Sequence, residues 1–358
     1  MSVARNSRVP RDSFADRERP ARRSRGNGCV SSLAIGLALG IALPLVALVW
    51  LQAVDDIGPA PLLIAYASLP WLIPVATVLV VALALFSRTI WVWLLALVLV
   101  GVFVFRYGGV WWPKPAVEVI GGHRLRVMTF NIGDGRVSAE DVMAWVRTED
   151  PDLLVIEELN FDTAPALNQG LAAGWPNQAL DFSSPTTGLF SRYPLNGAEF
   201  VPTPGNRAYL KADLELGDHA VHVFAMHPSS PDIVFRRGIP IGINDQTPRA
   251  QLLTVAEIVR ATEGPRVMLG DFNMSDQSPG YRQITQDLND AFAERGFGPG
   301  FTWPAEHSYR LRGWTPPVPL VRIDYVLHSG EFVAEAAHVN CDLSSDHCYV
   351  VADLILKP

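Results

Sequence analysis

The sequence carries little charge and little cysteine for its length. Only 18% of its 358 residues are charged, whereas soluble proteins of this size carry about a quarter. Three cysteines without a CxxC pair exclude a disulfide-framework scaffold and a zinc ribbon. The 28 glycines and 28 prolines are too few for a collagen or a low-complexity chain. With 49% hydrophobic residues, the apolar side chains must therefore be concentrated in one part of the chain.

The apolar excess lies in the first third of the chain. Three runs contain no charged residue, at 30–53, 57–87 and 89–105. Because a helix needs about 20 apolar residues to cross a bilayer, we predict three transmembrane helices, the third at the short end of the range. A buried hairpin of a soluble protein is the alternative, which the length of the uncharged runs disfavours. A cleaved signal peptide is disfavoured as well, since its apolar core is shorter and no A-x-A site follows.

Basic residues predict the orientation of these helices. Residues 1–29 contain eight arginines and three acidic residues, and the second short loop contains Arg88. The first short loop contains Asp55 and Asp56 and no basic residue. By the positive-inside rule, the N-terminal tail and Arg88 are cytoplasmic, and three crossings place the rest of the chain outside. We therefore expect a multi-pass protein of the plasma membrane with an extracytoplasmic domain.

The chain divides into four parts. We predict a basic cytoplasmic tail at 1–29, a membrane region at 30–106, a linker rich in glycine and proline at 107–122, and a globular domain at 123–358. After residue 113 the sequence contains 19 basic and 31 acidic residues, a net charge of −12. Such a surface is poorly suited to tracking long DNA by phosphate neutralisation.

The domain alternates predicted strands with a few helices, which favours an α/β layered fold. Ser138 is the expected N-cap of a first helix, and Thr247 with Pro248 is expected to begin a second one. The predicted strands cover 125–131, 153–156, 187–192, 219–226, 266–269, 323–327 and 349–356.

Polar side chains gather where these strands end. The candidates are Asn131, Glu157-Glu158, His227, Asp271 with Asn273, Asp324, and Asp346-His347. Each alone is typical of a turn or cap, but ligands of layered α/β folds gather at one edge of the sheets. Carboxylate and amide oxygens suit Mg²⁺ or Mn²⁺, and neighbouring histidines serve as acids or bases. The chain lacks both a glycine-rich phosphate loop and a G-x-S-x-G elbow, so metal-assisted attack of water on a phosphate ester fits best.

Six stretches resemble the endonuclease/exonuclease/phosphatase superfamily, which has the deoxyribonuclease-I-like fold. They are 127–132 (VMTFNI), 151–159 (PDLLVIEEL), 226–228 (MHP), 267–273 (VMLGDFN), 322–326 (RIDYV) and 345–347 (SDH). The superfamily includes pancreatic-type deoxyribonucleases, abasic-site endonucleases, inositol-phosphate phosphatases and neutral sphingomyelinases. The resemblance implies a four-layer sandwich of two mixed β-sheets flanked by helices, preceded here by the membrane helices.

The resemblance also implies roles for individual residues. Glu158 would be the main Mg²⁺ or Mn²⁺ ligand, with Asn131 beside it and Asp346 near the metal. Asp271 and Asn273 would position the attacking water and the phosphate. His347, oriented by Asp324, would contact the phosphate or act as acid or base. His227 would hold a non-bridging oxygen or protonate the leaving group.

Three further points stay open at this stage. The superfamily usually has glutamine before the metal-binding glutamate, so Glu157 rather than Glu158 could be the ligand, and strand alternation lets only one of them face the site. Arg192 is a candidate phosphate-binding residue, although a surface salt bridge is its alternative interpretation. Cys341 and Cys348 flank the Asp346-His347 loop and are candidates for a disulfide on an oxidising side of the membrane.

Three functions are compatible with these patterns. The first is a membrane-anchored, extracytoplasmic, metal-dependent phosphoesterase acting on a small phosphate ester or a lipid headgroup. The second is an extracellular-side nuclease that cleaves DNA or RNA phosphodiesters. The third is a non-catalytic binding module. The expected partners are the phosphate-ester substrate and the lipid bilayer, and the sequence indicates no protein partner.

Overall fold

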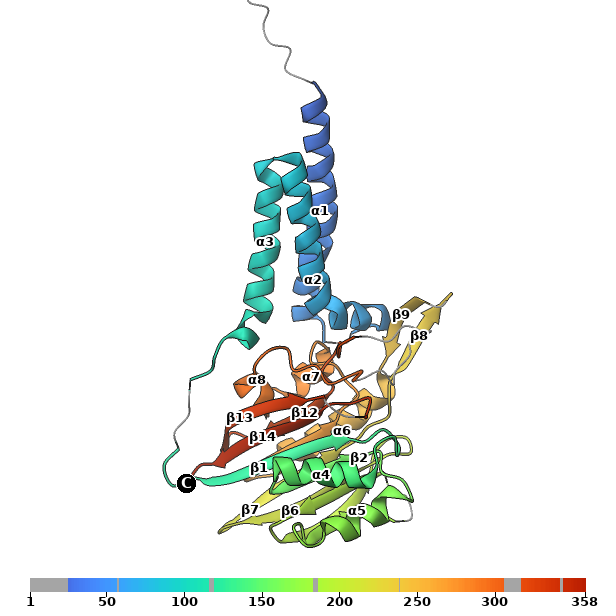
Figure 1. Cartoon of the computed structure of the whole chain (residues 1–358), viewed down its shortest axis with the longest axis vertical. Helices are drawn as coiled ribbons and strands as arrows, with labels where there is room; N and C mark the ends of the chain where they lie inside the picture. Colours follow the sequence, from blue (N-terminus) through green and yellow to red (C-terminus); the bar gives the residue numbers. More distant parts are fainter. Residues whose placement is uncertain are drawn as a thin grey trace, which may run out of the picture.

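The computed structural model describes residues 25–56, 58–115, 119–182, 186–237, 239–305, 317–341 and 344–358. Within them, three long helices stand on an α/β domain (Figure 1). The helices are α1 (Arg25–Val54), α2 (Ala60–Ser87) and α3 (Ile90–Tyr107). The predicted basic tail lies outside the described residues as far as residue 24.

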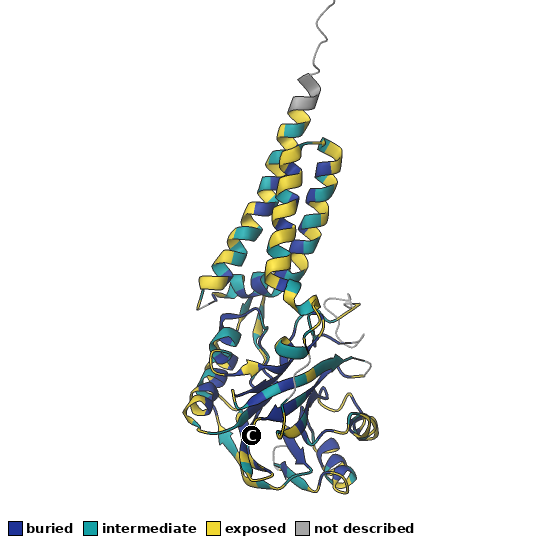
Figure 2. Cartoon of the chain, turned by 90° about the vertical axis from the view of Figure 1, so that its left-hand side faces the viewer, coloured by how far each residue is buried: buried dark blue, intermediate teal, exposed yellow. Residues whose placement is uncertain are grey.

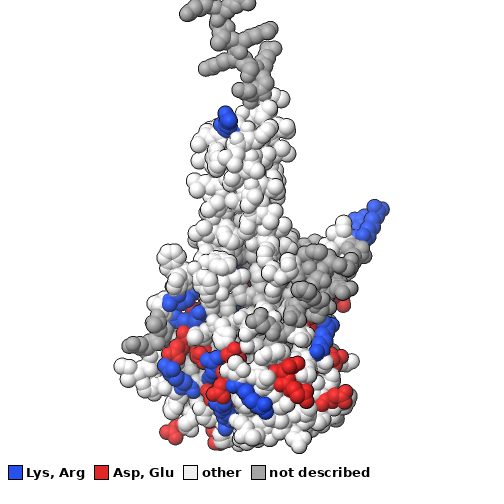
Figure 3. Space-filling view, in the orientation of Figure 1, with Lys and Arg blue, Asp and Glu red and all other residues white. Residues whose placement is uncertain are grey.

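All three helices are long and apolar enough to cross a membrane, over Cys29–Val54, Ala60–Ser87 and Ile90–Trp111. One buried cluster of the bundle is rich in small side chains such as Ala38, Ala84 and Ala96, which let the helices approach closely, whereas a second one contains large side chains such as Tyr66 and Leu69. The outer faces expose large apolar side chains such as Val78 and Phe105 (Figure 2). Figure 3 shows that charged atoms gather on the domain and leave most of the helical surface uncharged. These outer faces therefore fit a lipid environment.

The predicted linker begins with regular structure. A short 3-10 helix, Gly108–Trp111, follows α3 directly, so the glycines there do not break the chain as expected. Its Val110 carbonyl accepts a hydrogen bond from Gly298 N at 2.8 Å, and Trp111 packs edge-on against Phe297. The start of the linker is thus held against the domain by tertiary contacts.

The domain contains two six-stranded mixed sheets. The first has the order β13-β14-β1-β2-β4-β3, and its one parallel pair is β1 with β2. Its strands are β1 (His123–Asn131), β2 (Leu153–Glu157), β3 (Asn177–Leu180), β4 (Thr187–Ser191), β13 (Phe332–Asn340) and β14 (Tyr349–Leu356).

The second sheet has the order β11-β12-β10-β7-β6-β5, and β10 runs parallel to β7. Its strands are β5 (Leu195–Pro202), β6 (Ala208–Leu216), β7 (His219–Met226), β10 (Arg266–Asp271), β11 (Asn289–Asp290) and β12 (Asp324–His328). A separate hairpin consists of β8 (Asp232–Arg236) and β9 (Ile239–Asn244).

Strand alternation explains why the two sheets stack. In β1, Leu125 and Val127 face the second sheet, whereas Met128 and Phe130 face the outer helices. The outer layers contain α4 (Ala139–Glu149) and α5 (Thr163–Leu171) on the first sheet, and α6 (Gln246–Ala261) and α7 (Pro279–Ile284) on the second; α8 (Ala291–Arg295) follows β11. The expected four-layer sandwich of two mixed sheets flanked by helices is confirmed.

One of the two predicted helix caps is confirmed, and the other is wrong. Ser138 caps α4 and accepts a hydrogen bond from Asp141 N at 3.1 Å, as expected. The prediction that Thr247 caps the second helix is wrong, because α6 begins at Gln246 and Asp245 occupies the N-cap position. Thr247 and Pro248 instead lie in the first turn, where a proline removes no helical hydrogen bond.

Candidate active site

The site lies at one end of the layer between the two sheets. Asn131 ends β1, Asp271 ends β10, and His227 directly follows β7. Asp324 begins β12, the antiparallel neighbour of β10, and His347 lies two residues before β14. The parallel pairs in each sheet end at this edge, so residues far apart in sequence meet there.

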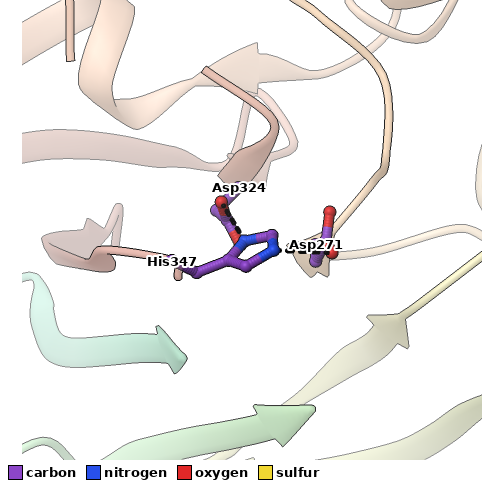
Figure 4. Close-up of side chains that lie close together, drawn as sticks. All are labelled: Asp271, Asp324 and His347. Carbon is purple, nitrogen blue, oxygen red and sulfur yellow. Dashed lines mark hydrogen bonds and ion pairs between the residues drawn. The ribbon is translucent and has the colours of Figure 1, made fainter. Parts of the chain in front are cut away.

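Asp271, Asp324 and His347 form a buried trio (Figure 4). His347 Nδ1 lies 3.2 and 3.1 Å from the two carboxylate oxygens of Asp324, which fixes the orientation of the imidazole ring. His347 Nε2 points toward Asp271, with 3.8 Å between Nε2 and Oδ2. All three side chains are almost fully buried, so their charges interact strongly.

Burial and the neighbouring charges shift the pKa of two of these groups. Burial disfavours the imidazolium form of His347, but Asp324 and Asp271 outweigh it and raise the pKa of His347 to about 10. Burial raises the pKa of Asp271 to about 7, with Asp324 adding to the rise and His347 opposing it. At neutral pH His347 is therefore an imidazolium held between two carboxyl groups.

Asn131 joins this trio to Glu158. Its Nδ2 donates to Glu158 Oε1 at 3.1 Å and to Asp271 Oδ2 at 3.0 Å. Its Oδ1 accepts a hydrogen bond from Gly133 N at 2.9 Å, which fixes the direction of the amide. Asn131 therefore positions the two carboxylates through its amide nitrogen, and its role as a metal ligand stays a prediction.

Both residues of the Glu157-Glu158 pair lie at the site, which corrects the expectation that only one could face it. Glu157 is the last residue of β2 and points between the sheets, where Thr129 Oγ1 donates to its Oε1 at 2.6 Å. Burial raises the pKa of Glu157 well above its usual range. Glu158 leaves the strand with φ 56°, so its side chain no longer follows the alternation and reaches Asn131. Glu157 is thus fully buried beneath the site, whereas the side chain of Glu158 is 32% exposed and accessible to solvent.

His227, which follows β7 in the second sheet, faces the carboxylates of Glu158 and Asp271. Its Nε2 lies 3.7 Å from Glu158 Oε1 and 3.9 Å from Asp271 Oδ2, and neither ring nitrogen has a hydrogen-bond partner in the described part of the chain. Burial lowers the pKa of His227 to about 3, with Arg207 and His347 adding to the shift. The His227 ring is therefore neutral at pH 7. It can donate or accept a hydrogen bond, but it is a poor general acid, because it has no additional proton to transfer.

The remaining predicted residues differ in their distance from this centre. Asn273 N donates to Asp271 Oδ1 at 2.7 Å, and Asn273 Nδ2 donates to the carbonyl of Pro228 at 3.1 Å, so Asn273 connects Asp271 to the His227 loop. Asp346 lies at the rim, where its carboxylate pairs with Arg136 at 3.3 Å.

The structure does not bring Arg192 to the site. Arg192 follows β4 at the end where Ser191 pairs with Leu153, whereas the site lies at the opposite end, beyond Glu157. It forms an ion pair with Asp150 and stacks over the Trp175 ring. We therefore do not assign substrate binding to Arg192, and its surface salt bridge is the interpretation that the structure supports.

Several positioning residues were missed in the sequence. Thr302 Oγ1 accepts from the backbone nitrogens of Ile323 and Asp324 at 3.0 and 3.3 Å. Ser345 Oγ donates to the Asn131 carbonyl at 2.7 Å and accepts from His347 N at 3.1 Å. Ser345 lies inside a motif that resembles the superfamily, but nothing local marks Thr302, because its partners are more than 20 residues away.

A disulfide flanks the His347 loop. Cys341 and Cys348 are bonded, with 4.3 Å between their Cα atoms, so this candidate pair is present in the structure. Cys348 N also donates to the carbonyl of Thr302 at 2.9 Å. Cys348, the residue directly before β14, is thereby linked to Cys341 and to Thr302.

Comparison with known proteins identifies the domain. The family model described as "Endonuclease/Exonuclease/phosphatase family" matches residues 128–347. The chain belongs to this family. No curated protein matches the chain. Among solved structures, an endonuclease/exonuclease/phosphatase from Beutenbergia cavernae is 23% identical with a TM-score of 0.50, covering 66% of this chain and 72% of its own.

Two further solved structures share the fold. A family protein from Bacteroides thetaiotaomicron is 14% identical, with a TM-score of 0.52 and coverage of 66% of this chain and 99% of its own. D. rerio TDP2 in complex with a single-strand DNA product is also 14% identical, with a TM-score of 0.52 and coverage of 64% and 98%. At these identities the likeness shows the fold, and the expected endonuclease/exonuclease/phosphatase fold is confirmed.

The donor set of this endonuclease/exonuclease/phosphatase site fits a divalent cation. Members of this family generally use one, and the ligand atoms of Asp271, Asp324 and His347 lie within 4.8 Å of one another. However, both carboxylate oxygens of Asp324 contact His347 Nδ1, so Asp324 and His347 are already paired with each other. Glu158 and Asp271 are better placed, because the same amide nitrogen holds both carboxylates and His227 faces them without a partner. Hard oxygen donors of this kind suit Mg²⁺ or Mn²⁺.

Proposed function

We propose that this chain is a membrane-anchored, divalent-metal-dependent phosphoesterase that hydrolyses a phosphate ester with an attacking water. The observation that carries the proposal is the meeting of the Asp271–His347–Asp324 trio with Glu158, Asn131 and His227 at one end of the inter-sheet layer. Family membership supports the reaction class, and the three apolar helices support the anchor.

Each residue has a role that follows from its surroundings. Asp271, ordered by Asn131 and by the backbone of Asn273, would orient the water and accept its proton as the oxygen attacks phosphorus. The ester P–O bond would break as the new P–O bond forms, and the leaving oxygen would take a proton from solvent water. The His347 imidazolium, held by Asp324, would stabilise the negative charge that develops on the phosphate oxygens. Neutral His227 would donate one hydrogen bond to a non-bridging oxygen, since its low pKa disfavours protonation of the leaving group.

Glu158 would be the main residue that holds the cation, with Asp271 sharing it and Asp346 nearby at the rim. When bound, a divalent cation polarises a phosphate oxygen and offsets the charge of the phosphate. Asn131 would keep Glu158 and Asp271 in place through its two hydrogen bonds. Asn273 would fix the His227 loop against Asp271.

The test is a substrate panel with the full chain in lipid nanodiscs, with Mg²⁺ or Mn²⁺ and with EDTA. The panel contains phosphomonoesters, small phosphodiesters, phospholipids, single-stranded DNA and duplex DNA. We expect divalent-dependent hydrolysis that His347→Ala abolishes and that the matched surface variant His338→Ala retains. Cleavage of DNA alone would identify the chain as a nuclease. Absence of divalent-dependent hydrolysis across the panel would overturn the proposal in favour of a binding module.

The side of the membrane requires a separate test. We propose that the domain lies outside the cytoplasm, which the arginines of the N-terminal tail and the Cys341–Cys348 disulfide support. A reporter that works only in the cytoplasm, fused after Pro358, is expected to stay silent. The same reporter fused after Arg88, which lies between α2 and α3, is expected to be active. The reverse pair of results would place the domain in the cytoplasm.

A further inference from the structure

The β8–β9 hairpin is unusually apolar for a surface element. It forms a two-stranded sheet of its own and pairs with neither of the large sheets. Its side chains Val234, Phe235, Ile239 and Ile241 are exposed, Ile239 by 66%. An isolated hairpin is marginally stable in water, and a cluster of exposed large apolar side chains marks a surface that contacts something else.

The hairpin lies against the helix that leads into the membrane bundle. Strand β9 packs on the start of α2, where Gly242 is so close to Ala60 that a Cβ atom on Gly242 would lie 3.0 Å from the Ala60 backbone. Ile243 packs in the same apolar cluster as Leu62 and Leu63 of α2. Figure 1 shows the hairpin beside the base of the bundle, with its turn directed away from the sheets. The hairpin is therefore held against the first residues of α2, at the base of the helix bundle.

The end of the hairpin carries positive charge. Arg236 is the last residue of β8, and Arg237 follows it in the turn; both are exposed. Asp232, at the opposite end of β8, is the only acidic residue in either strand. Figure 3 shows basic atoms at the outer end of the hairpin, apart from the mixed charges of the domain. Arginines next to exposed apolar and aromatic side chains are typical of segments that lie in a membrane interface.

We propose that the β8–β9 hairpin docks in the interface of the bilayer that α1–α3 would cross. Phe235, Ile239 and Ile241 would lie at the boundary with the acyl chains, and Arg236 and Arg237 would contact the phosphates of anionic headgroups. The apolar side chains would leave water, and each arginine would gain the attraction of an anionic surface. Because β8 begins five residues after His227, docking would fix the His227 side of the site relative to the membrane surface.

The position of the β8–β9 hairpin favours the bilayer, rather than a protein partner, as the surface on which it docks. The hairpin packs on the first residues of a span that runs from Ala60 to Ser87, so a membrane around that span lies directly beside it. The hairpin at β6–β7 provides the contrast within the same domain. The turn of that hairpin, Gly217-Asp218, is polar and lies far from the helix bundle (Figure 1).

The test places a polarity-sensitive fluorophore on the hairpin in the full chain. In a Cys29→Ser background, which removes the free cysteine and leaves the disulfide, single labels are attached at Ile239→Cys or at the control Asp218→Cys. The proteins are placed in nanodiscs of mixed zwitterionic and anionic phospholipid, with nitroxides on the headgroups or along the acyl chains. We expect a blue-shifted emission at 239 that lipid nitroxides quench at least about twofold more than at 218.

Three results would overturn the proposal. The label at 239 could match the label at 218 in both emission and quenching, which would show a hairpin in water. It could be shielded but not quenched by lipid nitroxides, which would indicate a protein partner. Disulfide crosslinking between two copies through Ile239→Cys, without lipid quenching, would identify that partner as a second copy of this chain.

A double substitution tests the contribution of the two arginines to docking. Arg236→Gln combined with Arg237→Gln is expected to reduce quenching at 239 in anionic discs and to change little in zwitterionic ones. Each arginine is expected to shift the ratio of docked to undocked hairpin about fivefold in anionic discs. Equal quenching before and after the double substitution in anionic discs would overturn the headgroup contact. Circular dichroism of the same samples checks that the domain stays folded.

Discussion

Arg322 and Asp324 lie two residues apart in the chain, and each belongs to a buried cluster of charged side chains. Around Arg322 the opposite charges are paired directly: its guanidinium lies 2.5 Å from Asp290 and 3.5 Å from Asp276, and only its Nε has no hydrogen-bond partner among the described residues. The rings of Tyr281, Tyr325 and Phe292 surround the guanidinium. Around Asp324 the pairing is incomplete. His227 and one oxygen of Glu157 have no hydrogen-bond partner among the described residues.

The difference separates structural from functional burial of charge. A buried charge without a partner costs several kcal/mol, so folding alone favours the arrangement around Arg322. The groups around Asp324 are held in place by the sheets and by backbone contacts. Polar groups kept without partners are expected where a ligand completes the pairing. The predictions below test this contrast, from the largest expected effect to the smallest.

His347→Ala is expected to have the largest effect. Loss of the imidazolium that Asp324 orients should reduce the hydrolysis rate by about 10²–10³-fold, the usual cost of removing one group that stabilises developing negative charge. Steady-state hydrolysis in nanodiscs measures this loss. The His338→Ala protein serves as the control, and a similar rate for both variants would remove His347 from the reaction.

Arg322→Ala is expected to have the largest effect on stability. Removing the cation leaves Asp290 and Asp276 buried without a partner, which should lower the free energy of unfolding by about 3–5 kcal/mol. Thermal unfolding in detergent micelles measures it. Arg322→Met, which keeps most of the volume, separates packing from charge, and equal stability of wild type and Arg322→Ala would refute the structural role.

Glu158→Gln and Glu157→Gln are expected to differ in their effect on metal binding. Glu158 lines the opening, so its neutral variant should bind Mn²⁺ about 10–100-fold more weakly. Glu157 is buried and held by Thr129, so Glu157→Gln should change the affinity by less than about threefold. Mn²⁺ titration followed by electron paramagnetic resonance measures both affinities. The opposite ranking would make Glu157 the ligand.

Glu149→Gln is expected to lower stability by about 1–3 kcal/mol at pH 7 without affecting hydrolysis. Burial acts to raise the pKa of Glu149, but hydrogen bonds from Tyr349, His338 and Arg126 outweigh it and lower the pKa. Stability from a lowered carboxyl pKa is present above the unfolded value near 4.3 and is lost as the pH falls below it. The gap in melting temperature between wild type and variant should therefore shrink below about pH 4, and a gap that persists in acid would contradict this origin.

Arg192→Gln is expected to have the smallest effect. Its partner Asp150 is exposed, and exposed ion pairs contribute at most about 1 kcal/mol. Hydrolysis should stay within about twofold of wild type, since the side chain lies at the opposite end of the sheet. A large rise in KM for a phosphate ester would restore Arg192 as a substrate-binding residue.

Much of the fold was predictable because local patterns express it directly. Long uncharged runs require apolar surroundings, so the three helices followed from composition alone. Strands such as β10 are short apolar runs that end in a polar motif, and the motif marked both the strand and the site. The start of α6 was predicted two residues too late, because Thr247 followed by Pro248 fits the pattern of a helix start as well as Asp245, the residue that occupies the N-cap.

The site was predictable in its members and less so in their arrangement. Alternation predicted that only one of Glu157 and Glu158 faces the site, and it could not predict the positive φ of Glu158 that brings both residues to it. The direction of the Asn131 amide depends on Gly133 N, and the place of Arg192 depends on the sheet register. Contacts between segments that are far apart in sequence decided each of these points, and a local pattern does not contain them.

For this protein, the sequence by itself determined that three apolar helices long enough to cross a membrane precede an α/β domain, and which residue types are available for chemistry. Hydrophobicity and strand period are local properties, and each residue carries its share of them. Tertiary structure alone decided which buried polar groups have a partner and which do not, among the described residues. It also placed an apolar hairpin beside the helix bundle. Those outcomes depend on distances between distant segments, which are fixed only when the two sheets stack.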